Sequence, residues 1–184
     1  MKRQFVKPKV VVSKCLTFAK CRYNGDVIND DFIEELKSFV DFEPVCPEVE
    51  IGLGVPRKAL RLVKKDKGIK LIQPANDRDV TQEMKEFATD YLDSLAGVDG
   101  FILKNRSPSC GTRDSKVYDT NGVPSMKDSG IFGGIVKEQY PRKAVTNEGR
   151  LKNFELREHF LTKLYTLAEF HQLKVEPSMS KLEN

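Results

Sequence analysis

Runs of apolar residues separated by polar segments predict three buried strands in this chain. The β-branched run Val10 to Val12 has the length of a strand and stops before Cys15. The shorter extended run "FEPV" ends at Cys46, and "GFILK" at 100–104 leads into the polar stretch that contains Cys110. Each predicted strand is therefore followed by a cysteine.

Other segments have the periods of a hairpin and of helices. "ALRLV" and "IKLIQ", separated by "KKDKG", alternate with a period of two and predict a hairpin with one solvated face. Helical spacing of apolar residues is clearest from Thr81 onward. Residues 105–129 contain no such pattern and predict a long polar loop. Helices are predicted over residues 29–40, from Thr81 to Leu95, over 130–140, and over about 153–173.

The alternation of strands and helices predicts an α/β fold with a mainly parallel sheet flanked by helices, an inserted β-hairpin and a C-terminal helix. We expect one domain over residues 1–150, with 151–184 forming a helix and a frayed tail packed on it. In such sheets the ligand site lies outside the carboxyl ends of the strands. The fold is thus expected to bring Cys15, Cys46 and Cys110 to the same edge.

Composition narrows the chemistry of these thiols. The chain has 184 residues, of which 39% are hydrophobic and 32% charged, and a net charge of +4. Its longest apolar run falls far short of the ~20 residues that span a bilayer, so no membrane partner and a cytoplasmic location are expected. Glutathione keeps thiols reduced in that compartment, so the four cysteines are better candidates for metal binding or catalysis than for disulfides.

The spacing of the cysteines leaves three interpretations open: ordinary thiols, a zinc site and an iron-sulfur cluster. Structural zinc sites favour close pairs of cysteines, whereas Cys15 and Cys21 are separated by five residues and the others lie much farther apart. An iron-sulfur cluster accepts thiolates from distant loops. With three thiolates on a 4Fe-4S cluster, one iron stays open for a substrate.

The residues around the second and third cysteines add candidate catalytic groups. "PVCPEVEIGLGVPR" from Pro44 to Arg57 is rich in proline and glycine and predicts a stiff turn rather than a helix or strand. It holds Glu48 two residues from Cys46, a placement that suits a general acid or base. In "SPSCG", Ser107 precedes a proline that shapes the turn leading to Cys110.

The motifs "VSKCL" with "CRYNG", "PVCPEVEIGLGVPR" and "GFILKNRSPSCG" together resemble the DUF523 family, which includes the thiouracil desulfidases. The resemblance covers about Val10 to Leu161. It implies a 4Fe-4S cluster held by Cys15, Cys46 and Cys110, with catalytic roles for Glu48 and Ser107. One departure is "CLTF", where many relatives have "CLLG", so the first loop lacks a glycine.

The activity implied by this resemblance is hydrolysis of the thiocarbonyl group of thiouracil or thiouridine, which gives uracil or uridine and hydrogen sulfide. Expected partners are a thiolated pyrimidine base, nucleoside or nucleotide. Intact tRNA is less supported, because the further C-terminal domain of some relatives is missing. Two alternatives are a non-catalytic iron-sulfur or sulfide-binding module and a thiol-based redox enzyme. Candidate substrate contacts are Arg22, Tyr23, Lys104 and Arg106.

Cys21 and the basic hairpin are interpreted more simply. Cys21 lies six residues beyond a better-placed cysteine and is expected to be a plain buried or half-exposed thiol rather than a spare ligand or sulfide relay. The basic run "RLVKKDKGIK" alternates with apolar residues, which fits a solvated hairpin face better than an RNA contact.

Overall fold

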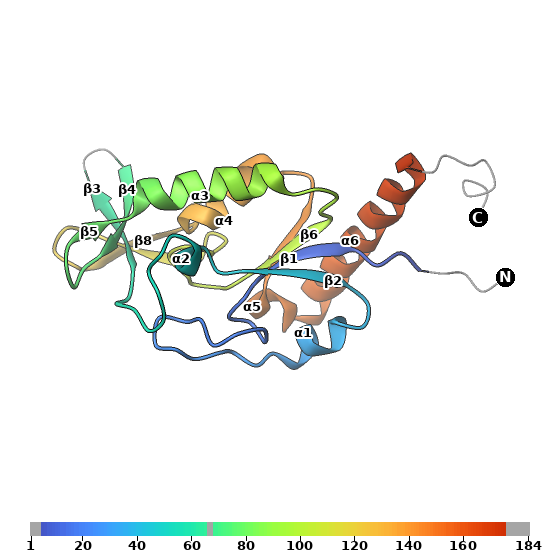
Figure 1. The fold of residues 1–184 in the computed structure, drawn as a ribbon, viewed down its shortest axis with the longest axis horizontal. Coiled ribbons are helices and arrows are strands. Elements are labelled where there is room, and N and C mark those ends of the chain that lie inside the picture. Colours follow the sequence, from blue (N-terminus) through green and yellow to red (C-terminus); the bar gives the residue numbers. More distant parts are fainter. Residues whose placement is uncertain (1–4, 66–67, 176–184) are drawn as a thin grey trace.

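The computed structural model describes residues 5–65 and 68–175, which form a three-layer α/β structure with a second sheet at one end (Figure 1). The predicted frayed tail at 176–184 lies outside these residues. The strands are β1 (Lys9–Ser13), β2 (Asp41–Val45), β3 (Arg61–Lys65), β4 (Gly68–Gln73), β5 (Arg78–Asp79), β6 (Gly100–Leu103), β7 (Ser115–Tyr118), β8 (Pro124–Asp128) and β9 (Ala144–Asn147). The helices are α1 (Asp31–Leu36), α2 (Pro47–Glu50), α3 (Thr81–Ser94), α4 (Ile131–Gln139), α5 (Glu148–Leu151) and α6 (Phe154–Val175).

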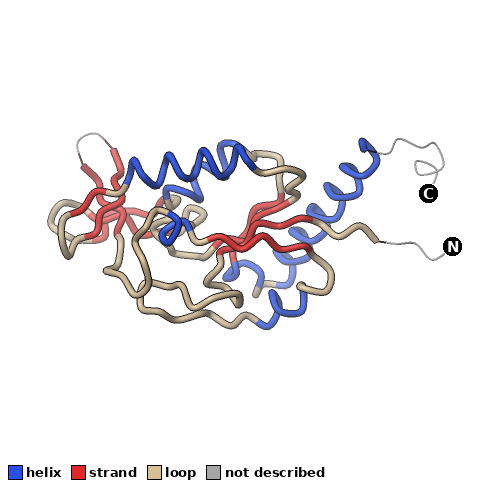
Figure 2. Tube along the Cα trace, viewed as in Figure 1, coloured by secondary structure: helices blue, strands red, loops and turns tan. Residues whose placement is uncertain are grey.

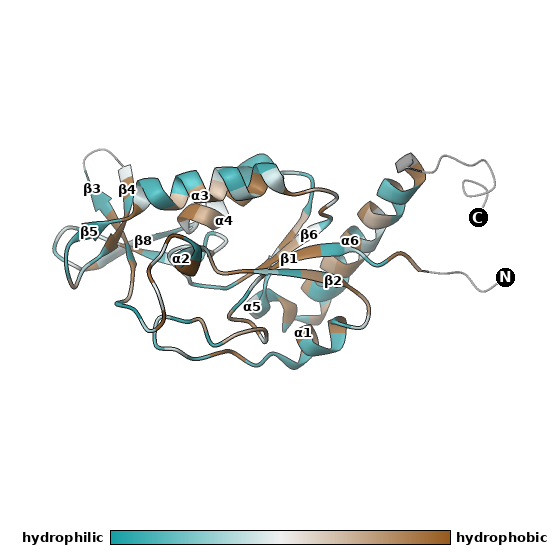
Figure 3. Cartoon of the chain, viewed as in Figure 1, coloured by the Kyte–Doolittle hydropathy of each residue, from teal (hydrophilic) through white to brown (hydrophobic). Residues whose placement is uncertain are grey.

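The central sheet has four parallel strands in the order β2-β1-β6-β9. Its residues alternate between two apolar layers. Val11 and Phe101 face α3 and α4, whereas Val10, Val12 and Ile102 face α1 and α6. Both faces are covered, which explains why the two inner strands β1 and β6 appear as continuous apolar runs in the sequence. Figure 3 shows the hydrophobic colour along β1 and β6.

The second sheet has five strands in the order β5-β4-β3-β7-β8. It contains the predicted hairpin, because β3 and β4 pair antiparallel. Figure 2 shows its strands crossing at the end of the molecule away from α6, with α3 running from this sheet towards the central one. The α/β fold class expected from the sequence is confirmed.

Three local predictions were wrong. The segment expected to be a long polar loop contains β7, in which buried residues alternate with more exposed ones, and β8, whose residues are mostly exposed. The expected stiff turn after Cys46 forms the four-residue helix α2, which has a proline in its first turn, where proline lacks no helical hydrogen bond. The sequence pattern also missed the short strand β9, which completes the central sheet.

All four predicted helices are present, as α1, α3, α4 and α6. Asp30 caps α1 by accepting a hydrogen bond from the Ile33 amide at 3.1 Å. The last helix, α6, packs Phe160, Leu164 and Ala168 into the core on the α1 side of the sheet. The division into a domain ending at residue 150 and an appended helix stays a prediction.

None of the helices within the described residues has the combination of length and apolar character needed to span a bilayer. The expected cytoplasmic location stays a prediction.

Candidate functional site

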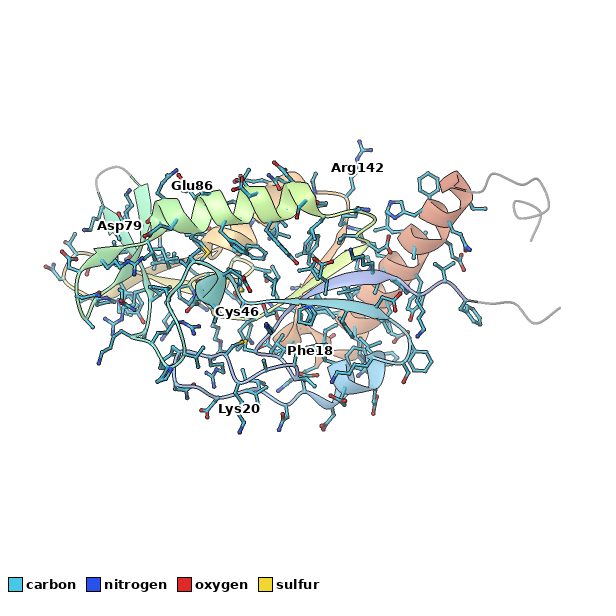
Figure 4. All side chains as sticks on the ribbon, viewed as in Figure 1. Phe18, Lys20, Cys46, Asp79, Glu86 and Arg142 are labelled. Carbon is cyan, nitrogen blue, oxygen red and sulfur yellow. The ribbon has the colours of Figure 1, made fainter. Side chains whose placement is uncertain are left out.

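Four cysteines line one cavity at the carboxyl ends of β1, β2 and β6. This cavity, called the thiol pocket below, has a volume of about 360 Å³ and is lined by Cys15, Cys21, Cys46 and Cys110, among other residues. Figure 4 labels Cys46 beside α2, near the middle of the molecule. β1 has β2 on one side and β6 on the other, so the pocket lies where the strand order reverses, the usual ligand site of such sheets.

The strands place the thiols. Cys15 follows β1 by two residues, Cys46 follows β2 directly, and Cys110 follows β6 by seven residues. Three of the four are buried, Cys15 is partly exposed, and all four are free thiols. The structure thus brings together the three cysteines that the sequence placed at this edge, and Cys21 joins them as a buried thiol.

Contacts among the thiols change their acidity. The pKa of Cys21 is raised to about 11, mainly because its thiol hydrogen-bonds with Cys15. A hydrogen bond with Cys21 and burial raise the pKa of Cys46. Burial raises the pKa of Cys110 to about 12. Hydrogen bonds with the hydroxyls of Ser13 and Ser107 lower this pKa but do not offset the effect of burial. These thiols are therefore protonated near neutral pH, and metal binding would release their protons.

Both carboxylate oxygens of Glu48 have partners. The Ser109 hydroxyl donates to Oε1 at 2.8 Å, and Arg57 Nε donates to Oε2 at 2.7 Å. The Arg57 side chain is 4% exposed and that of Glu48 is 12% exposed, so this is a buried ion pair. Arg57 Nη1 also donates to the Cys21 carbonyl at 3.0 Å. The carboxylate is thus fixed at the wall of the thiol pocket between two separate loops.

Neither partner of Glu48 was predicted. Arg57 is the last residue of the motif "PVCPEVEIGLGVPR". It lies nine residues after Glu48, a separation that neither a helix nor a strand turns into a contact, so the spacing did not predict the pair. Ser109 is fully buried, although serine is mostly an exposed residue type. The only hint in the sequence was its place between Pro108 and Cys110 in a motif that already held two candidate site residues.

Ser107 organises the turn before Cys110. Its hydroxyl oxygen accepts hydrogen bonds from the amides of Ser109 at 3.2 Å and Cys110 at 3.1 Å. Its hydroxyl also hydrogen-bonds with the Cys110 thiol, which lowers the pKa of that thiol. Ser107 also lines the thiol pocket.

Two glycines near the start of α4 clamp the loop that carries Cys110. A Cβ atom on Gly133 would lie 2.4 Å from the Gly111 carbonyl oxygen, and one on Gly130 would lie 2.4 Å from that of Ser109. This close approach lets the Gly133 amide donate to the Ser109 carbonyl at 3.0 Å. The first turn of α4 therefore holds the loop by backbone hydrogen bonds.

The four predicted substrate contacts all line the thiol pocket but differ in their partners. Lys104 donates to the buried carboxylate of Glu148, so its charge is neutralised within the fold. Arg106 is exposed and has a positive φ of 55°. The Arg22 guanidinium lies 5.9 Å from the ring centre of Tyr23, which is 46% exposed. Arg106 and Tyr23 are thus the more accessible pair.

A larger cavity adjoins the thiol pocket and is strongly basic. This basic cavity has a volume of about 1230 Å³, and Asp114 is its single carboxylate among the described residues. It shares Tyr23, Asn105, Arg106 and Pro108 with the thiol pocket, so the two cavities are neighbours on either side of these residues. Its cations are Arg61, Arg106, Arg113, Lys116, Lys127, Lys137 and Arg150.

The thiol pocket suits an iron-sulfur cluster better than a single ion. Within residues 5–65 and 68–175, no three His, Cys, Asp or Glu side chains are arranged to hold one metal ion. A cluster differs because its irons are separate and each takes its own thiolate. Soft thiolates on separate loops around one cavity are the donor set that such clusters use, so the residues present fit this cofactor.

Comparisons with known proteins agree with this fit. A family model described as 2-thiouracil desulfurase matches residues 10–148. The uncharacterized protein YbbK of Bacillus subtilis is 30% identical over 149 residues, which cover 76% of this chain and 96% of YbbK. The solved structure of the 4Fe-4S-dependent thiouracil desulfidase TudS, of DUF523, superposes with a TM-score of 0.62 at 26% identity, covering 83% of this chain and 99% of TudS.

Proposed function

Because the chain belongs to the 2-thiouracil desulfurase family, we propose that it hydrolyses the thiocarbonyl group of thiouracil or thiouridine at a 4Fe-4S cluster held by Cys15, Cys46 and Cys110. Water replaces sulfur at the carbon, so the products are uracil or uridine and hydrogen sulfide, without electron transfer. The observation that carries the proposal is the meeting of these thiols with Glu48 and Ser107 in one pocket.

Cluster and protein divide the chemistry. When bound, the cluster supplies an iron without a protein ligand, a soft Lewis acid for the thiocarbonyl sulfur. Glu48 lies two residues after Cys46 at the pocket wall and accepts a proton from the attacking water. Arg57 and Ser109 keep that carboxylate aimed by holding one oxygen each.

Ser107 positions the reacting groups. Its oxygen accepts hydrogen bonds from two backbone amides, which hold the oxygen in place. From this fixed position the hydroxyl can donate a hydrogen bond to water or substrate. Arg106 and Tyr23, at the accessible side of the thiol pocket, contact the rest of the pyrimidine or its ribose.

The raised thiol pKa values argue against a thiol-based redox enzyme. Reactive cysteines need a lowered pKa so that the thiolate is present at neutral pH. Burial and mutual hydrogen bonds raise the pKa of Cys21, Cys46 and Cys110 instead. A non-catalytic cluster-binding module has no need of a carboxylate held by a buried arginine.

The first prediction concerns protein purified and reconstituted without oxygen. Cys46→Ala is expected to lose both iron and sulfide release from 4-thiouracil, because it removes a cluster ligand. Glu48→Ala is expected to keep the iron and labile sulfide and to lose about 10²–10⁴-fold in kcat, because it removes only the proton acceptor. Iron content, labile sulfide and sulfide release are measured on the same preparations.

Cys21→Ala is the matched control, since it removes another buried thiol from the same pocket and is expected to keep the cluster. Turnover by a cluster-free Cys46→Ala protein would refute the cluster-dependent reaction. Full turnover by Glu48→Ala would remove that residue from the mechanism.

A further inference from the structure

The basic cavity has more positive charge than the fold neutralises. None of its seven cations forms an ion pair with another described residue, and Arg61 is engaged instead over the ring of Tyr118 at 4.8 Å. The single carboxylate, Asp114, accepts hydrogen bonds from the Thr112 amide and the Asn147 side chain. Charges left unpaired in a concave site concentrate a positive potential there.

The acidity of one cavity residue reports this potential. The pKa of Lys137 lies below its ordinary value, first because the group is partly buried and then because Arg113 and Arg150 lie near it, whereas Asp114 raises it. Neighbouring cations repel one another, and this repulsion lowers the stability of the fold. That cost is removed when an anion binds between them.

The size and charge of the cavity point to a polyanion. Its volume of about 1230 Å³ exceeds the ~300–1,000 Å³ typical of sites for small molecules. One terminal phosphate carries about two negative charges, fewer than a third of those that seven cations would balance. The phosphodiester backbone of a nucleic acid supplies one charge per nucleotide along the whole cavity.

We propose that the basic cavity binds the sugar-phosphate backbone of single-stranded RNA, which presents a thiolated uridine to the thiol pocket. This inference rests on the proposed function, which identifies the reacting base as a thiopyrimidine. Tyr23 and Arg106, which line both cavities, lie where the thiolated base would turn away from the RNA backbone. An exposed aromatic ring and a guanidinium are the groups on which unpaired bases stack.

The base must be unpaired to react. The thiol pocket, at about 360 Å³, must hold the cluster as well as the base, so it has room for one base and not for a base pair. A strand or loop that already exposes its thiolated uridine reaches the pocket without the cost of opening a duplex. Single-stranded RNA is therefore preferred over the same sequence in a duplex.

The test measures binding of a labelled oligouridylate of about ten nucleotides, within the ~4–16 that single-strand sites cover, with one central 4-thiouridine. Fluorescence anisotropy is recorded with the anaerobic, cluster-loaded protein over a range of salt concentrations. With four or five phosphates contacted, the slope of log K against log salt is expected near about −3 for the wild type.

Two triple variants remove the same charge from different places. Arg113→Gln/Lys137→Gln/Arg150→Gln takes three cations from the cavity and is expected to lose about two units of the salt slope and at least ~10-fold in affinity. Lys64→Gln/Lys85→Gln/Arg142→Gln takes three exposed cations from elsewhere and is expected to keep both. Figure 4 labels Arg142 at the periphery of the molecule.

The ratio of kcat/KM for the oligonucleotide to kcat/KM for free 4-thiouracil is also measured and is expected to fall at least ~10-fold in the cavity variant. Equal loss of RNA affinity in both triple variants would overturn the inference, as would wild-type binding of uridine monophosphate as tight as that of the oligonucleotide. Iron content and circular dichroism check that the variants are folded and loaded.

The same preparations separate the two proposals. Sulfide release from the free base without tight oligonucleotide binding refutes the RNA inference and leaves the proposed function standing. Absence of sulfide from every thiolated substrate refutes the proposed function, whatever the RNA affinity.

Discussion

Glu48 shows how the fold prepares one carboxylate for chemistry. Its two oxygens are held by residues nine and sixty-one positions away in the chain, Arg57 and Ser109. Arg57 places a permanent positive charge beside the carboxylate, because a guanidinium stays protonated in proteins. The orientation of the Glu48 carboxylate therefore depends on two side chains from other parts of the chain.

The Arg57–Glu48 pair gives a prediction for stability. Arg57→Gln leaves the buried carboxylate without its cation and is expected to lower the free energy of unfolding by about 3–5 kcal/mol. In the double variant Arg57→Gln/Glu48→Gln no charge is left unpaired, so its loss is expected to be smaller than the sum of the two single losses by about 1–3 kcal/mol. Urea unfolding of cluster-free, reduced protein measures all three variants. Strictly additive losses would mean that the two residues do not interact.

Residue types and their positions after strands were enough to predict that Cys15, Cys46, Cys110 and Glu48 meet at one edge of the sheet, because backbone connectivity decides where a strand ends. Arg57 and Ser109 were not predictable in the same way. Their contacts with Glu48 depend on how two irregular loops fold against each other, and no periodic pattern records that. The basic cavity was missed for the same reason, since its cations come from six separate parts of the chain.

At the scale of elements, the contact between α4 and the Cys110 loop shapes the site. The helix begins with glycines at the two positions where its backbone meets the loop. The Gly130 amide donates to the Gly111 carbonyl at 2.9 Å, and the Ile131 amide donates to the Pro108 carbonyl at 3.2 Å. Helix amides that would otherwise lack partners thus fix the loop.

Two neighbouring glycines of α4 provide a matched test of this contact. Gly133→Ala introduces a Cβ 2.6 Å from the Cys110 carbonyl oxygen and is expected to cost about 1–3 kcal/mol of stability and to reduce iron content. Gly134→Ala meets nothing closer than the Ser129 Cβ at 3.6 Å, so it is expected to be neutral or to stabilise the helix by up to about 1 kcal/mol. Thermal unfolding and iron analysis compare the two, and similar behaviour would contradict the clamp.

Strands that contain a run of apolar residues were predicted correctly, whereas the more polar strands β7 and β8 were not. β1, β2 and β6 lie inside the sheet or carry apolar side chains, so the sequence marks them. β7 buries only Ser115 and Val117, and β8 is mostly exposed, so neither strand contains an apolar run that the sequence could show. A usable signal was present in Asn121-Gly122, a pair typical of hairpin turns, and Gly122 has a φ of 81°.

At the scale of the whole molecule, α6 belongs to the same core as the central sheet. Leu164 is fully buried, and it lies so close to β6 that a Cβ on Gly100 would be 2.8 Å from its Cδ1. Figure 1 shows α6 crossing beside β1 and β6. Removal of this packing is therefore expected to weaken the entire fold.

Leu164→Ala is expected to lower the free energy of unfolding by about 2–5 kcal/mol in a single cooperative transition, because it leaves a cavity in the core. Phe39→Ala, at a ring that is 60% exposed, removes a larger side chain and is expected to change stability by less than about 1 kcal/mol. Chemical unfolding followed by circular dichroism measures both. Two separate transitions would show that α6 unfolds independently of the sheet.

The parallel order β2-β1-β6 also dictates when the cofactor can arrive. Cys15, Cys46 and Cys110 come together only after three strands, joined by crossovers, have paired, and such long-range pairing is a late event in folding. A nascent or half-folded chain offers no complete set of ligands. We therefore expect iron and sulfide to be inserted into the folded protein, and a protein that has lost its cluster to keep its fold and accept a new one.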